Sequence, residues 1–190
     1  NVDALESWGT SYHISSTEEF VQFMSKESYD ATARIGLLAD IDLQGLEVGS
    51  IKKFDGVFDG NGYRIKNWAM TAPMFETLNG TLQNLVMDES CTVENVPADE
   101  DFAVMVRYNN GLISGCTNYV DLKVEGVEFS KAHSIGGVVA ITTSRVEECY
   151  NYGDIPLLPS NVVNFTSNAS EGSTLYLGGV IGKVNTLVDP

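Results

Sequence analysis

The sequence predicts an all-β fold: a right-handed parallel β-helix, or solenoid, with a short N-terminal capping α-helix. Three observations lead to this prediction. Helical periodicity is confined to one early segment, residues 16–28. After it, short apolar segments alternate with turns that contain Gly or Asn. Those segments recur with constant internal offsets, which is the signature of a stacked repeat architecture.

Composition and charge exclude several classes of protein. The chain has 190 residues, of which 43% are hydrophobic, so residues 1–190 can form a single domain with its own core. No run of apolar residues is long enough to cross a membrane as a helix. The 26 acidic residues outnumber the 11 basic ones and give a formal charge of −15. This charge repels phosphate backbones, so we expect no nucleic-acid partner.

The predicted helix covers residues 16–28. Ser16 and Glu19 have the spacing of a capping box, in which the N-cap hydroxyl and a Glu three residues later satisfy the first N–H groups. Phe20, Phe23 and Met24 follow at helical spacing and form one apolar stripe. An apolar helix at the start of a solenoid is suited to covering the exposed end of its core.

The repeat occupies residues 35–188. Four similar segments start at residues 72, 103, 136 and 178, which are 31, 33 and 42 residues apart. Two sets of apolar residues keep constant offsets of ten and thirteen residues from these starts: Leu82, Ile113, Val146 and Val188, and Leu85, Cys116 and Cys149. A sandwich of hairpins is the alternative β architecture, but its turns would not make the offsets recur.

Stacking of the repeats predicts ladders of identical side chains. Successive coils would lie about 4.8 Å apart, so that equivalent residues share one apolar column. Cys116 and Cys149 would then be neighbours in the core, which we favour over a redox role. Two further pairs are expected to stack beside them: Asn118 on Asn151, and Tyr119 on Tyr152. The crossover rule predicts that the coil is right-handed.

These residues resemble the GLUG-repeat proteins, bacterial secreted or surface proteins built as right-handed β-helices. The resemblance is carried by residues 54–62 (Phe-Asp-Gly-Val-Phe-Asp-Gly-Asn-Gly) and by units such as 136–140 (Gly-Gly-Val-Val-Ala), which lead to Cys149. It covers roughly residues 12–188. It implies an extracellular or cell-surface location and a role as an adhesin without enzymatic activity. The implied partner is a host or bacterial surface protein or a glycan.

Exposed aromatic side chains and the longest inter-repeat loop are the candidate binding elements. The loop, within residues 156–174, is rich in Ser, Asn and Pro, and solenoids often place recognition in such excursions. Trp68 is expected in register with Leu85 and Cys116 and would have to be exposed in order to stack on a sugar ring. The candidate ligand-binding residues are Trp68, Tyr108, Tyr119, Tyr150, Tyr152, Asn164 and Phe165.

Two other chemistries remain as alternatives. Asp55, Asp59 and Asn61 could ligate calcium through oxygen atoms, although Asp-Gly and Asn-Gly pairs are more often tight turns. No other cofactor is expected. Arg64 and Lys66 resemble the cations of pectin-cleaving β-helix enzymes, so a uronate hydrolase or lyase is one alternative function. A passive structural stalk is another.

The last repeat stops early, at Pro190. We therefore expect the chain to be part of a longer repeat array. An uncovered final coil would leave strand edges unpaired, and self-association through this C-terminal end is expected.

Overall fold

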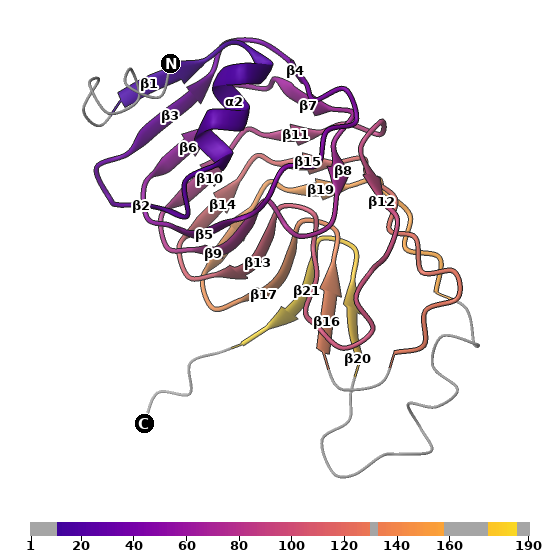
Figure 1. Ribbon diagram of the computed structural model, residues 1–190. Coiled ribbons are helices and arrows are strands. Elements are labelled where there is room, and N and C mark those ends of the chain that lie inside the picture. The colour runs from indigo at the N-terminus through magenta and orange to yellow at the C-terminus, as the bar shows by residue number, and fades with distance from the viewer. Residues whose placement is uncertain (1–10, 130–132, 158–174, 186–190) are drawn as a thin grey trace, which may run out of the picture.

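The computed structural model describes residues 11–129, 133–157 and 175–185. In these residues the protein is mainly β, with parallel sheets and one helix at its start, as the sequence predicts. Figure 1 shows short strands that succeed one another around the molecule while the chain advances from the indigo end to the orange and yellow end.

The helix α2 (Thr17–Met24) is shorter than predicted. The hydroxyl of Ser16 accepts the backbone N–H of Glu19 at 3.2 Å, which confirms the cap, and Phe20, Phe23 and Met24 are buried. The prediction that it continues to residue 28 is wrong. Residues 25–28 are exposed and bring no apolar side chain to the core, so nothing stabilises a further turn. The chain instead enters strand β2 at Ser28.

Three long sheets and two short pairs contain all the described strands, each sheet ordered as the chain runs. Sheet 1 contains β1 (Ser11–Ile14), β3 (Arg34–Leu37), β6 (Val57–Asp59), β10 (Thr81–Gln83), β14 (Leu112–Ser114) and β18 (Arg145–Glu147). Sheet 2 contains β4 (Ile41–Asp42), β7 (Arg64–Lys66), β11 (Val86–Met87), β15 (Thr117–Asn118) and β19 (Tyr150–Asn151). Sheet 3 contains β2 (Ser28–Tyr29), β5 (Ile51–Phe54), β9 (Phe75–Leu78), β13 (Val106–Asn109), β17 (Val139–Thr142) and β21 (Ile181–Val184). The short pairs are β8 (Ala69–Met70) with β12 (Thr92–Val93), and β16 (His133–Gly136) with β20 (Leu175–Gly178).

Strand register confirms the repeat inferred from the sequence. Leu82 pairs with Ile113, and Ile113 pairs with Val146, so the ten-residue offset corresponds to one column across sheet 1. Gly136 pairs with Gly178, which confirms the alignment of the last two starts. Val188, the fourth member of that column, lies outside the described residues.

The column begins earlier than the sequence analysis recognised. Ile35 pairs with Phe58, and Phe58 pairs with Leu82. The two steps are 23 and 24 residues long (58 − 35 and 82 − 58), shorter than the later ones, and they lack the Gly-Gly segment on which the later units align. Coils of different length can share one column because only the turns and loops between strands change.

The core is one continuous cluster of apolar side chains with the helix at its N-terminal end. Phe23 lies 5.4 Å from Phe58 and 6.1 Å from Phe54, measured between ring centroids. Phe20 meets Trp68 edge-on at 5.8 Å. These contacts place the apolar face of α2 on the first coils, where Figure 1 shows the helix beside the indigo strands.

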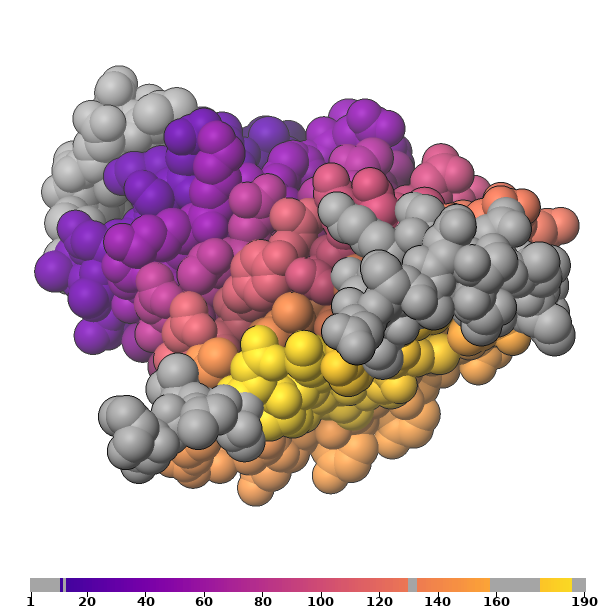
Figure 2. Space-filling view, turned by 90° about the horizontal axis from the view of Figure 1, so that it is seen from below, coloured from indigo at the N-terminus to yellow at the C-terminus, as the bar shows by residue number. Residues whose placement is uncertain are grey.

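The C-terminal coil is less buried than those before it. Strands β18, β19, β20 and β21 are each the last of their sheet among the described residues. Figure 2 shows the final strands, in yellow, beside the orange coil that precedes them. Val146 is only partly buried, whereas Leu82 and Ile113 are fully buried in the same column.

Candidate ligand-binding face

Tyrosine rings form a ladder along the outer side of sheet 2. Tyr119 and Tyr152 follow β15 and β19, and their rings are stacked with centroids 5.2 Å apart and planes 14° apart. Tyr150 lies beside Tyr152, at 6.4 Å and 16°. The guanidinium carbon of Arg64 lies 5.1 Å from the ring centroid of Tyr119. Tyr150 and Tyr152 are 55% and 63% exposed, so the ladder presents aromatic surface to solvent.

Two asparagines hold this ladder in place. The amide nitrogen of buried Asn118 donates to Oδ1 of Asn151 at 2.9 Å in the next coil, as predicted. Asn118 also bonds the backbone of Val120, and Asn151 bonds the carbonyl of Gly153. Each asparagine therefore fastens a bend whose intermediate residue is a tyrosine. The bends repeat in register, so the two rings are set in parallel.

Charged residues beside the ladder are paired with one another. Arg64 donates to Oδ1 of Asp88 at 2.7 Å, and Ser90 donates its hydroxyl to Oδ2 of the same carboxylate at 2.7 Å. Burial raises the pKa of Asp88, but these hydrogen bonds outweigh it and the net pKa is lowered. Lys66 lies 3.2 Å from Asp40, so both cations that resemble uronate-binding residues already face a carboxylate.

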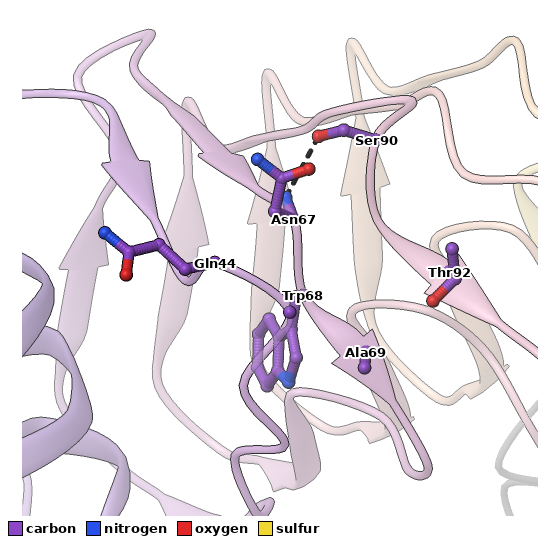
Figure 3. Close-up of a pocket in the computed structure, with 7 residues that line it drawn as sticks. Gln44, Asn67, Trp68, Ala69, Ser90 and Thr92 are labelled. Carbon is purple, nitrogen blue, oxygen red and sulfur yellow. Dashed lines mark hydrogen bonds between the residues drawn. The ribbon is translucent and has the colours of Figure 1, made fainter.

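A polar depression adjoins this face. It has a volume of about 410 Å³ and lies where successive turns follow β4, β7 and the 88–91 turn. The backbone N–H of Asn67 donates to the hydroxyl of Ser90 at 2.9 Å, as Figure 3 shows, and its amide donates to Asp42 at 3.0 Å. Asp88 connects the depression to the ladder because it binds both Ser90 and Arg64. The lining residues are Gln44, Gly45, Asn67, Trp68, Ala69, Ser90 and Thr92.

Trp68 is not exposed as a stacking surface. Its side chain is 1% exposed, its ring packs on Phe20 and its indole N–H donates to the carbonyl of Val48 at 3.3 Å. Its predicted register is also wrong: Ala69 pairs with Thr92, which aligns Trp68 with Cys91. The turn between β7 and β8 differs in length from those of later coils, and counting residues cannot detect this.

Tyr108 lies on sheet 3, apart from the tyrosine ladder. Its ring is 38% exposed, and its hydroxyl donates to Asp101 at 2.8 Å. Burial and this carboxylate raise the pKa of Tyr108 to about 12. Asp101 also accepts the backbone N–H of Ser134, so this carboxylate has a structural role.

The proposed calcium ligands do not share one turn. Asp59 accepts hydrogen bonds from the backbone of Asn61 and from the side chains of Gln83 and Asn84. Asn61 has a φ of 52°, which confirms a turn there. Asp55 lies before β6 and Asp59 ends it; Asp55 binds the amide of Asn79. The residues that the structure describes contain no cluster of three or more His, Cys, Asp or Glu side chains arranged for a metal. Calcium binding stays a prediction.

Other features were not accessible to the sequence analysis. The contact between Arg64 and Tyr119 spans two coils of unequal length, and the depression is formed by small polar residues without any motif. Asn164 and Phe165 lie outside the described residues.

Comparison with models of protein families, with curated proteins and with solved structures finds no match to this chain. Within the described ranges, no helix has the length and apolar character that crossing a membrane requires.

Proposed function

We propose that the chain is a right-handed parallel β-helix of the GLUG-repeat type that acts, without enzymatic activity, as a carbohydrate-binding module at a bacterial surface. The parallel register of sheets 1, 2 and 3 supports the architecture. The right-handed sense follows from the general rule for parallel crossovers. One observation carries the function: the partly exposed, parallel rings of Tyr119, Tyr150 and Tyr152.

The chemistry of this face suits a sugar polymer. Tyrosine combines an apolar ring face with a polar hydroxyl, so it can pack on the C–H face of a pyranose while donating to its hydroxyls. The adjoining depression offers amides and hydroxyls, which are the polar groups that orient a ligand in a binding site. A repeating ligand also matches a surface whose side chains recur from coil to coil.

The charges favour a neutral glycan over a uronate. Arg64 and Lys66 are each paired with a carboxylate, so binding an anionic sugar at either would require breaking an existing ion pair. The chain as a whole has a charge of −15 and repels anionic polymers. For this reason we do not propose the polysaccharide-cleaving activity.

Glycan-array binding of the intact chain tests the proposal. We expect neutral glycans to bind, and the double variant Tyr150→Ala/Tyr152→Ala to lose affinity by tenfold or more while retaining its circular dichroism spectrum. The matched control is Tyr108→Ala, which removes a partly exposed tyrosine from a different sheet and should leave binding unchanged. Repeating the assay with calcium and with a chelator tests the calcium prediction.

Two results would contradict the proposal. Equal loss of binding in the Tyr108 control would show that the ladder is not the site. Failure of every glycan to bind would favour the passive stalk or a protein partner.

A further inference from the structure

Cys116 and Cys149 occupy equivalent positions in successive coils. Thr117 pairs with Tyr150, and the N–H of Tyr150 donates to the carbonyl of Cys116 at 2.9 Å, so the two cysteines lie one above the other. Both follow a residue with positive φ: Gly115 at 67° and Glu148 at 51°. The same backbone conformation on both coils directs the two side chains the same way.

The two thiols have matching contacts and interact with each other. The thiol of Cys116 donates to the carbonyl of Ser114, and that of Cys149 donates to the carbonyl of Glu147, in each case two residues earlier. The adjacent Cys116 thiol stabilises the thiolate of Cys149 and lowers the pKa of Cys149, while that of Cys116 is raised. The strand spacing of about 4.8 Å falls within the Cα separations that disulfides span.

Their exposure to solvent differs. Cys116 is fully buried, whereas Cys149 is only partly buried, between β18 and β19, which are the last described strands of their sheets. A dissolved oxidant can therefore reach Cys149 first. Cys91, the third cysteine, is 3% exposed and aligns with Trp68, in a different part of the coil.

We propose that Cys116 and Cys149 form a dithiol modification site that is converted by exogenous disulfides into a covalent link between the last two coils. This inference is independent of the proposed carbohydrate binding. It gives the cysteine ladder a chemical function in addition to packing.

The reaction proceeds by two exchanges. The Cys149 thiolate attacks one sulfur of glutathione disulfide, forms a mixed disulfide and releases one glutathione. The Cys116 thiol then loses its proton, and the resulting thiolate attacks the Cys149 sulfur and releases the second glutathione. The protein loses two electrons and two protons, and glutathione disulfide gains both.

Incubation of the intact chain with glutathione disulfide, followed by alkylation under denaturing conditions and mass spectrometry, tests the site. We expect one alkylated cysteine, Cys91, where the reduced protein has three, and a peptide that links Cys116 to Cys149. The variant Cys116→Ser should stop at the first exchange and retain one glutathione on Cys149. Cys149→Ser should remain reduced, and the control Cys91→Ser should cross-link as the parent chain does.

Several results would overturn the inference. They are three free thiols after incubation, a link that includes Cys91, a covalent dimer as the main product, or no glutathione retained by Cys116→Ser. A functional consequence is measured on the same samples. The cross-link shortens the loop available to the unfolded chain, so the urea midpoint should rise in the oxidised parent chain and not in Cys149→Ser.

Discussion

Shortening Leu82 to alanine measures directly whether stacked coils share one core column. Leu82 is fully buried between Phe58 and Ile113, its register partners in the coils before and after it. The substitution removes three carbon atoms, and at about 0.8 kcal/mol for each buried carbon the transfer cost is about 2.4 kcal/mol. Hydrogen-bonded strands on both sides prevent the space from collapsing. A cavity contribution is therefore added, and we expect a total loss of about 3–4 kcal/mol.

The same column contains a weaker position that serves as a comparison. Val146 is only partly buried, so Val146→Ala, which removes two carbons, should cost less than about 1.6 kcal/mol. Thr81→Ala, on the same strand as Leu82 but half-buried, should change stability by about 0.5 kcal/mol or less. Urea unfolding followed by circular dichroism measures all three. Equal losses at Leu82 and Val146, or a loss below about 1 kcal/mol at Leu82, would refute the shared column.

Three further predictions concern the turns and the charged face. Asn118→Ala leaves buried backbone groups unpaired and should cost about 2–3 kcal/mol in urea unfolding; a loss under about 0.5 kcal/mol would show that the ladder is dispensable. Gly62 has a φ of 78° and open space around it, so Gly62→Ala should cost about 1–2 kcal/mol of backbone strain, while Gly49→Ala, also in open space but without positive φ, should not. The pKa of Asp88 is lowered in the folded state, so its contribution to stability is present above its unfolded pKa of about 3.9 and is lost as pH falls through the folded value. The stability of Asp88→Asn should therefore decline less between pH 5 and the acid transition, and an unchanged pH profile would contradict this.

The sequence was sufficient where a physical requirement recurs once in every coil. An inward position must be apolar and a bend must be fastened, so Leu82 with Ile113, and Asn118 with Asn151, could be aligned by counting residues. The N-terminal cap could be predicted as well, because Ser16 and Glu19 are local in the chain. These features depend on spacing alone.

Sequence reasoning failed where coils differ in length or where exposure decides the outcome. Trp68 was assigned the wrong neighbours because the turn after β7 departs from the later repeats. Its burial depends on Phe20, a residue of the helix at the opposite end of the sequence repeat. The first two steps of the column, at Ile35 and Phe58, were not recognised because their units lack the Gly-Gly start.

The same reasoning indicates where binding function can reside in this fold. Inward side chains and bend asparagines are constrained by their neighbours in adjacent coils, so a change at one of them disturbs the stack. Outward residues have no such requirement, and Val86, Thr117 and Tyr150 occupy one row of sheet 2 with three unlike side chains. Parallel, exposed tyrosines in two coils are therefore not demanded by the architecture. The stacking of Tyr119 on Tyr152 contributes little burial there, and recognition of a ligand gives the ladder a physical purpose that the fold alone does not supply.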